Sequence, residues 1–362
     1  MSKILIIANN AGGLYDFRGD LIKKLVSLGH TVTASVPATE NVEELVSIGC
    51  KVIDTPVDRR GMNPIKDLDL VTKYNKILNQ IKPDIVLTYT IKPNVYGGFL
   101  CRLKNISYAV NITGLGSTFQ NEGLLKKLVT AMYKVSAKKA KVVFFENIEN
   151  LETFVKLGIA KHEQTQLLNG AGVNLEKFKF EEYPIENGTT RFLFMGRVMA
   201  EKGVNELFNA MDRLYNDGYK VNLDLLGNYE EDYKTIIDKY EKKGWLKYHG
   251  YQEDVKPFIK NSHCFVLPSW HEGMANTNLE SGAMGRPVIT SNIHGCLEAV
   301  VNGKTGFLVE PKNADSLYEK FKEFIELPYD KKCEMGRESH NHIAKNFDKK
   351  DVVEKTIQRL QI

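Results

Sequence analysis

Short apolar segments recur along this chain, and each is followed by a polar turn and a longer amphipathic segment. The first is the continuous run from Ile4 to Ala8, and the next is the run from Thr31 to Val36. Continuous apolar runs are typical of buried parallel strands. Strands that alternate with helices predict a doubly wound α/β fold. The same pattern predicts strands at Lys51–Val57, Asp84–Thr88, Tyr108–Ile112, Val142–Phe145, Arg191–Met195, Val221–Leu226, Cys264–Leu267 and Phe307–Val309.

The length of the chain indicates two domains. A chain of 362 residues is long for one core and suits two domains of roughly 150 to 200 residues each. The segment from Asn169 to Asn174, followed by Phe178, marks the expected change of domain. We therefore expect one α/β domain over residues 1–172, a second over residues 173–345, and a final helical segment over residues 346–362.

Composition limits the possible classes of protein. Hydrophobic residues make up 43% of the chain and charged residues 26%, as in ordinary soluble proteins. The five cysteines are scattered without a metal-binding spacing, which argues for a reducing cytoplasm and against a disulfide framework or a zinc site. We expect no membrane span, because no apolar run reaches about 18 residues, and no signal peptide. Nucleic-acid binding is not expected, because the net charge is only +4 and no aromatic–basic platform stands out.

The stretch from Cys264 to Thr290 carries the strongest candidate site. The strand at Cys264–Leu267 is followed by a polar turn that contains Glu272. Asn276 or Thr277 can then cap a helix, with Glu280 completing a capping box in its first turn. The start of that helix would suit a phosphate, at the edge of the sheet where α/β proteins bind ligands. Alternatively, Glu272 is only a solvated carboxylate and Glu280 only a cap.

Two cations follow another predicted strand. Gly196 and Arg197 come directly after Arg191–Met195, and Lys202 precedes Gly203. Arginine can grip two phosphate oxygens, whereas lysine acts as a point charge. Such cations can stabilise the negative charge that builds on a nucleoside diphosphate leaving group. The alternative is a pair of solvated surface side chains.

Loops in the first half also follow predicted strands. They include a turn with two glycines at Asn9–Gly13, a loop that contains Lys92, and a loop with Thr113 and Gly114. No GxGxxG motif is present, so a bound dinucleotide is only weakly indicated. Simple turn chemistry could also explain these loops.

A basic amphipathic helix is predicted over residues 122–141. No acidic residue lies between Glu122 and Glu146, and the first 175 residues hold 22 Lys and Arg against 15 Asp and Glu. A helix of this kind suits the surface of an anionic membrane. It could equally be a core-facing helix with a solvated basic side. Six lysines, Lys126, Lys127, Lys134, Lys138, Lys139 and Lys141, accompany an apolar stripe made by Leu124, Leu125, Leu128, Val129, Met132 and Val135.

These motifs together resemble a known enzyme family. The frame PSxxEGxxxxxLExxxxGxPVI, which contains Glu272 and Glu280, is similar to the signature of retaining GT-B glycosyltransferases of family 4. The element that contains Arg197 and Lys202 resembles the GRxxxxKG element of that family, and Asn174 replaces the usual Asp of its NGxGVDxxxF segment. The string SWHEGMANTNLESGAMGRPVI resembles the branch that adds sugars to polyprenyl-diphosphate-linked glycans in bacteria. The resemblance implies a last helix that crosses back to the first domain.

The resemblance also implies roles for individual residues. Glu272, Arg197 and Lys202 would serve catalysis, and Glu280 would bind the ribose. Acceptor binding would fall to Arg18, Lys92, Thr113 and Gly114. The other residues expected to bind a UDP-sugar are Gly13, Gly196, Gly227, Tyr251, Gly273, Met274, Ala275, Asn276 and Thr277.

The implied mechanism is front-face attack, in which the departing phosphate takes the acceptor proton. Glu272 would then not be a covalent nucleophile of the glycosidase type. Many relatives place a His in the loop that here reads Asn111-Ile112-Thr113-Gly114, and His271 is a weak substitute. No cofactor or metal is expected. Two alternatives stay open: a GT-B epimerase that acts on a UDP-sugar, and a non-catalytic protein that binds sugar nucleotides.

Overall fold

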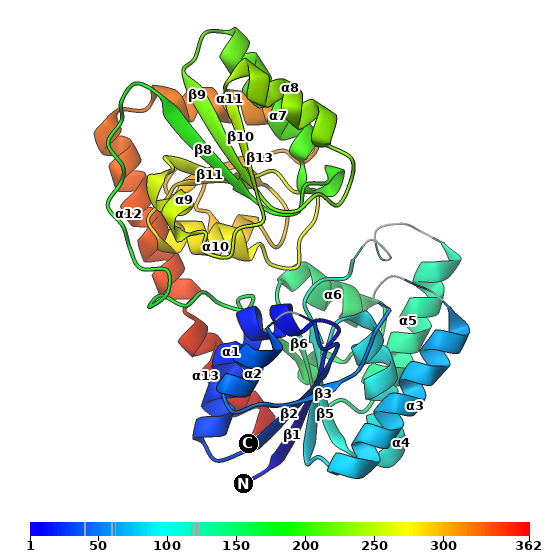
Figure 1. The fold of residues 1–362 in the computed structure, drawn as a ribbon. Coiled ribbons are helices and arrows are strands. Elements are labelled where there is room, and N and C mark those ends of the chain that lie inside the picture. The colour runs from blue at the N-terminus through cyan, green and yellow to red at the C-terminus, as the bar shows by residue number, and fades with distance from the viewer. Residues whose placement is uncertain (40, 59–60, 62, 117–118, 120–122) are drawn as a thin grey trace. The chain divides into compact units, whose positions relative to one another are not determined.

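The computed structural model describes residues 1–362 except 40, 59–60, 62, 117–118 and 120–122 (Figure 1). The chain forms two compact units. Unit 1 comprises Met1–Ala171 together with Lys350–Ile362, and unit 2 comprises Gly172–Lys349.

Unit 1 is built on a parallel sheet of seven strands in the order β3-β2-β1-β4-β5-β6-β7. The strands are β1 (Lys3–Ile7), β2 (Thr31–Val36), β3 (Lys51–Asp54), β4 (Ile85–Tyr89), β5 (Ser107–Ile112), β6 (Val142–Phe145) and β7 (Thr165–Leu167). The helical segments are α1 (Ala11–Ser27), α2 (Val42–Ser47), α3 (Pro64–Ile81), η1 (Pro93–Gly97), α4 (Gly98–Lys104), α5 (Leu124–Ala137), α6 (Ile148–Lys156), η3 (His162–Gln164) and α13 (Lys349–Leu360).

Both faces of this sheet are covered. Alternate residues of a strand point to opposite faces, so Ile4 and Ile6 of β1 enter one core while Leu5 and Ile7 enter the other. Helices α1, α2 and α13 contribute to the first core. Helices α3, α4, α5 and α6 contribute to the second. The strands are therefore apolar at nearly every position because both faces of the sheet are buried, as the sequence predicted.

Unit 2 is built on a parallel sheet of six strands in the order β10-β9-β8-β11-β12-β13. The strands are β8 (Thr190–Met195), β9 (Val221–Leu226), β10 (Leu246–Gly250), β11 (Cys264–Leu267), β12 (Val288–Ser291) and β13 (Gly306–Val309). The helical segments are η4 (Ala200–Lys202), α7 (Val204–Asn216), α8 (Lys234–Lys243), α9 (Lys256–Asn261), α10 (Asn276–Ala283), η5 (Leu297–Ala299), α11 (Ala314–Glu326) and α12 (Tyr329–Asn346). The predicted doubly wound architecture is confirmed for both units.

The beginning of α1 differs from the prediction. The turn expected at Asn9–Gly13 is largely helix, because α1 begins at Ala11 and includes Gly12 and Gly13. The side chain of Asn10 caps it by accepting a hydrogen bond from the backbone N–H of Gly13. Glycine has a low helix propensity, so the two glycines did not indicate a helix here. The Asn10 cap offsets the unfavourable propensity of these glycines.

The segment that precedes β8 is fastened to unit 2 by the buried side chain of Arg286. Its guanidinium donates hydrogen bonds to the carbonyls of Glu181, Glu182 (2.9 Å) and Met284 (3.1 Å). Burial lowers the pKa of Arg286 to about 10, so it stays charged at neutral pH.

None of the helices in the described ranges is long and apolar enough to cross a membrane.

We expect Arg286→Met to lower the free energy of unfolding by about 3 kcal/mol, because buried carbonyls lose a charged donor. Denaturant titration would measure this loss. Arg213→Met is the matched control, since Arg213 is partly exposed and pairs with the exposed Asp315. It should cost less than about 1 kcal/mol. Equal losses in the two variants would contradict the role given to Arg286.

Candidate functional site

The strongest candidate site lies at the carboxyl ends of the central strands of unit 2. Strand β8 lies between β9 and β11. The connection from β8 runs through α7 to β9, whereas β11 pairs with the other side of β8, so the order of the strands reverses there. Ligands of open α/β sheets bind at such a switch point. Arg197 follows β8, Gly227 follows β9 and Glu272 follows β11.

The side chains of Lys202 and Glu272 are in direct contact at this edge. The ammonium of Lys202 donates to Oε1 of Glu272, and the Ser269 hydroxyl donates to the same oxygen at 2.8 Å. The two charged side chains are only 17% and 12% exposed. The pair therefore places an ammonium beside a carboxylate in a largely buried position, where a bound phosphate can replace Glu272 as the partner of Lys202.

Arg197 has a different carboxylate partner. Its Nη1 lies 3.6 Å from Oε2 of Glu230, and its side chain is half exposed. Because Arg197 immediately follows Gly196 at the end of β8, the guanidinium is on the same sheet edge as Lys202. The two predicted cations thus come from one strand-to-helix connection and are held by separate acids.

The start of α10 corrects one prediction. The residue at the N-cap is Ala275, with no side-chain hydrogen bond to the helix end. Thr277 is therefore not the cap, the predicted capping box is wrong, and Glu280 lies at the fifth helical position instead of in the first turn. The physical reason is a tertiary contact: the Ala275 N–H donates to the carbonyl of Gly295 at 2.7 Å.

That contact also leaves one fewer backbone amide for the phosphate predicted at the start of α10. The amide of Ala275 is already satisfied by Gly295, and the side chains of Met274 and Ala275 are buried in the core of unit 2. Gly295 has φ +91°, and a Cβ there would lie 2.7 Å from the Glu272 carbonyl oxygen. The loop after β12 therefore packs tightly beneath the turn that presents Glu272. Gly273 in this turn, and Asn276 and Thr277 at the start of α10, remain predicted contacts for the UDP-sugar.

Aromatic residues gather where β9 and β10 end. The rings of Tyr229 and Tyr248 lie 4.7 Å apart, and the Tyr248 hydroxyl donates to the carbonyl of Gly227 at 2.9 Å. Tyr251, the predicted contact for a nucleotide base, is 64% exposed. Neither Tyr229 nor Tyr248 was predicted as a site residue, although Tyr229 lies only two residues after Gly227 at the end of β9.

Unit 1 holds a buried ion pair at the carboxyl edge of its sheet. Arg18 of α1 donates to Glu146, the residue after β6, at 2.5 Å, and the two side chains are 9% and 8% exposed. The guanidinium carbon of Arg18 lies 5.2 Å from the ring centre of Tyr89. Burial raises the pKa of Glu146, and the nearby Arg18 opposes this shift. Arg18 was predicted as a site residue but Glu146 was not, because its partner is 128 residues away in the chain.

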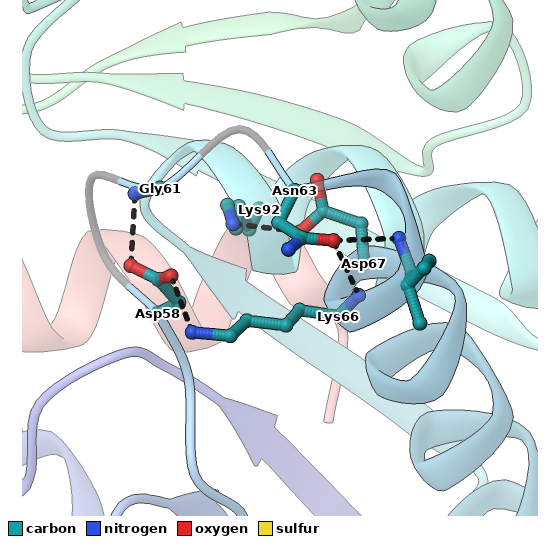
Figure 2. A network of polar contacts seen from close by, with 7 residues as sticks. Asp58, Gly61, Asn63, Lys66, Asp67 and Lys92 are labelled. Atoms are coloured by element: carbon teal, nitrogen blue, oxygen red, sulfur yellow. Dashed lines mark hydrogen bonds and ion pairs between the residues drawn. The ribbon is translucent and has the colours of Figure 1, made fainter.

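Lys92 lies in a polar network at the same edge (Figure 2). Its ammonium donates to Asp67 of α3 at 2.6 Å. Burial, and a hydrogen bond to the same Asp67, raise the pKa of Tyr96 to about 12. In the adjoining loop, Asp58 lies 3.4 Å from Lys66. The predicted acceptor contact Lys92 is thus already paired, and Thr113 and Gly114 follow β5 nearby in the sheet order.

The sequence predicts no metal centre. Among the residues that the structure describes, no group of three or more His, Cys, Asp or Glu side chains is arranged to hold a metal ion.

Two family models match the chain. "Glycosyl transferase 4-like" matches residues 3–147, and "Glycosyl transferases group 1" matches residues 176–346. The first match falls in unit 1 and the second in unit 2, and between them they span most of the chain.

Curated relatives match along much of their length. A Campylobacter jejuni N,N'-diacetylbacillosaminyl-diphospho-undecaprenol alpha-1,3-N-acetylgalactosaminyltransferase is 28% identical over 341 residues, which cover 90% of this chain and 89% of the relative. An Escherichia coli UDP-Gal:alpha-D-GlcNAc-diphosphoundecaprenol alpha-1,3-galactosyltransferase is 29% identical over 311 residues, 78% of this chain and 76% of the relative.

A solved structure, that of Anabaena HepE in complex with UDP and glucose, has a TM-score of 0.82 at 16% identity and covers both chains fully. At this level of identity the likeness concerns the fold alone. It confirms the two-domain architecture that the sequence motifs implied.

Proposed function

Since this chain belongs to the GT-B glycosyltransferases of family 4, we propose that it is a retaining enzyme that transfers a hexose or N-acetylhexosamine from a UDP-sugar to a glycan on a polyprenyl diphosphate. Such a reaction would serve the synthesis of bacterial surface polysaccharide. The relatives named above act on diphosphoundecaprenol-linked sugars, and one of them takes its sugar from UDP-Gal.

The observation that carries the proposal is the contact between Lys202 and Glu272 at the switch point of unit 2. When a glycosidic bond to a nucleoside diphosphate breaks, negative charge develops on the leaving phosphate. Lys202 and Arg197 would stabilise this charge, since fixed cations at the site of developing charge lower the barrier. In this proposal Glu272 lies near the donor sugar and Glu280 accepts hydrogen bonds from the ribose.

The surroundings of Glu272 favour front-face attack over a covalent intermediate. One of its oxygens already receives hydrogen bonds from both Lys202 and Ser269. A carboxylate oxygen that is held by an ammonium and a hydroxyl is a weak nucleophile, because its lone pairs are engaged. The departing phosphate would instead take the proton of the acceptor hydroxyl. No metal or cofactor enters this scheme.

Helix α5 supports a membrane-bound acceptor. Leu124 and Leu128 are 85% and 57% exposed, whereas Tyr133 and Ala137 of the same helix are buried. These leucines do not face the core, whereas Val129 and Met132 of the same predicted stripe pack against it. Helix α5 thus has a core-facing side, as one of the two sequence interpretations holds, and an exposed apolar end that suits a membrane surface. Glu122, at the start of the predicted helix, lies outside the described residues.

Neighbouring α4 extends this surface, because Leu103 is 62% exposed and Arg102 donates to the Val135 carbonyl of α5. Exposed leucines among lysines suit an anionic bilayer: the apolar side chains insert and the cations meet the headgroups. The enzyme would thus act as a peripheral protein on the inner face of the cell membrane.

We expect the double variant Leu124→Asp, Leu128→Asp to bind vesicles of phosphatidylglycerol at least tenfold more weakly. Burying each leucine contributes about 1.5 to 3 kcal/mol, and the new charges repel the headgroups. Co-sedimentation at two salt concentrations would measure binding, which should also weaken with salt. Val46→Asp is the control, since Val46 is an exposed residue of α2 away from the basic helix. Unchanged vesicle binding by the double variant would exclude this surface.

A UDP-release assay tests the function directly. A panel of UDP-sugars is offered with and without a polyprenyl-diphosphate-linked sugar. Release that requires the acceptor, with retention of the anomeric configuration in the product, is the expected result. A change of the UDP-sugar without acceptor would indicate an epimerase, and UDP binding without any turnover would indicate a binding protein. Either of these results would overturn the proposal.

A further inference from the structure

The turn that presents Glu272, residues 268–275, is held by the loop that follows β12. Gly295 of this loop meets the turn at two points. Its carbonyl accepts a hydrogen bond from the Ala275 N–H at 2.7 Å, and a Cβ on it would lie 2.7 Å from the carbonyl oxygen of Glu272. Any shift of Gly295 would therefore be transmitted to the backbone of Glu272.

The carboxylate of Glu298 fixes the position of Gly295. Its Oε2 accepts the backbone N–H of Gly295 at 2.7 Å, and its Oε1 accepts the Nδ1–H of His294 at 2.8 Å. Hydrogen bonds to a charged acceptor are about twice as strong as those between neutral groups. Loss of this carboxylate would therefore release the segment of the loop that touches the Glu272 turn.

Helix α12 in turn fixes Glu298. The Nε2 of His342 donates to the Glu298 carbonyl at 2.8 Å, and the Nδ1 of the same ring accepts from the side-chain amide of Asn346 at 3.2 Å. Because Nδ1 accepts, the proton of the neutral ring lies on Nε2, as the contact with Glu298 requires. A chain of hydrogen bonds thus runs from α12 through Glu298 and Gly295 to the Glu272 turn, entirely within unit 2.

Helix α12 also holds the far end of α10, independently of His342. The Nδ1 of His340 donates to the carbonyl of Ala283, the last residue of α10, at 2.6 Å. The two helices approach closely there, because a Cβ on Gly282 would lie 2.8 Å from the side chain of Ile343. The contact between His342 and Glu298 is therefore not needed to keep α10 on α12, and its separate effect is on the loop and the turn.

We propose that His342 and Glu298 are positioning residues for sugar transfer, which act through Gly295 to hold Glu272 in place. This inference rests on the proposed function, in which Glu272 lies near the donor sugar. Misplacing a group at the reacting centre by about 1 Å can cost roughly 10²-fold in rate. Loss of either positioning residue should therefore slow turnover without weakening the binding of UDP.

Trp270 reports on the Glu272 turn without any substrate. The chain has two tryptophans; Trp245 is 1% exposed, whereas Trp270 is partly exposed and lies two residues before Glu272. Quenching of the fluorescence of the full-length protein by acrylamide therefore measures mainly Trp270. We expect Glu298→Ala and His342→Phe each to raise the quenching constant about twofold, because the turn opens more often.

Matched variants separate positioning from a general loss of packing. Glu298→Gln keeps an oxygen for the Gly295 N–H, and His342→Gln keeps an N–H for the Glu298 carbonyl, so both should be quenched as the wild type is. His340→Phe removes the same kind of hydrogen bond from α12, but at the far end of α10. It should lower the thermal unfolding temperature about as much as His342→Phe does, and it should leave the quenching unchanged.

Steady-state kinetics give the second readout. Glu298→Ala and His342→Phe should lower kcat for UDP release about tenfold, the equivalent of one lost hydrogen bond. The Kd of UDP, measured by calorimetric titration, should stay within about twofold of the wild-type value, because no contact to the nucleotide is removed. His340→Phe should keep the wild-type kcat.

The inference is overturned if Glu298→Ala and His342→Phe are quenched as the wild type is, or if His340→Phe raises the quenching equally. It is also overturned if kcat falls no further in the two positioning variants than in His340→Phe. Absence of UDP release by the wild type would instead overturn the proposed function, a result that the quenching comparison cannot produce.

Discussion

Lys202→Ala should lower kcat for sugar transfer by about 10²- to 10³-fold, the usual loss when one group that stabilises developing charge is removed. Lys202 is in contact with Glu272, and the donor phosphate would replace that carboxylate as its partner during the reaction. Without the ammonium, the leaving diphosphate loses a cation in a partly buried place. Initial rates of UDP release at saturating donor would measure the effect.

Lys304→Ala is the matched control, because Lys304 is an exposed lysine of unit 2 that pairs with Glu338. It should leave kcat unchanged. Lys202→Arg retains the positive charge and should fall between the wild type and Lys202→Ala. If Lys202→Ala keeps a kcat near that of the wild type, Lys202 has no role in stabilising the leaving group.

Gly227→Ala should abolish donor binding and destabilise unit 2. Gly227 has φ +133°, and a Cβ there would lie 1.9 Å from the carbonyl oxygen of Gly196. The ends of β8 and β9 would have to separate, and these ends position Arg197 and Tyr229. Strained overpacking typically costs about 1 to 3 kcal/mol, and the left-handed backbone adds roughly 1 to 2 kcal/mol. Calorimetric titration with UDP and thermal unfolding would measure the two losses.

Gly218→Ala separates these two causes. Gly218 also has a positive φ, +88°, but nothing lies within 4 Å of the Cβ that would be added. This variant should lose only the roughly 1 to 2 kcal/mol of backbone strain and should bind UDP as the wild type does. Equal losses in both variants would show that the close approach of Gly196 and Gly227 does not matter.

The strands were predictable because their signal is local. The run Cys264–Leu267 is apolar at every position, and it forms a strand that is fully buried. The position of Glu272 after that strand follows directly, and so does the position of Arg197 after β8. The contact of Lys202 with Glu272 was not predicted, since it joins residues 70 positions apart.

The remaining differences also arise from distant contacts. The Gly295 carbonyl accepts a hydrogen bond from the backbone N–H of Ala275, and α10 therefore does not begin at the expected cap. In the sequence, Glu146 resembles any acidic residue after a strand, because its partner Arg18 is 128 residues away. Thr90, the residue after β4, has φ +73°. This left-handed backbone is disfavoured for a β-branched residue, so the residue pattern at the end of the strand did not indicate it.

Unit 1 is not a continuous stretch of the chain, and this affects its biosynthesis. Val352, Val353 and Leu360 of α13 belong to the core that β1 and α1 also enter, yet they are translated only after all of unit 2. Until then, the apolar face that α13 covers stays exposed to solvent. A nascent chain with this exposed face would bind chaperones or aggregate. A polypeptide that ends at Lys349 contains all of unit 2, whereas its unit 1, though earlier in translation, still lacks α13.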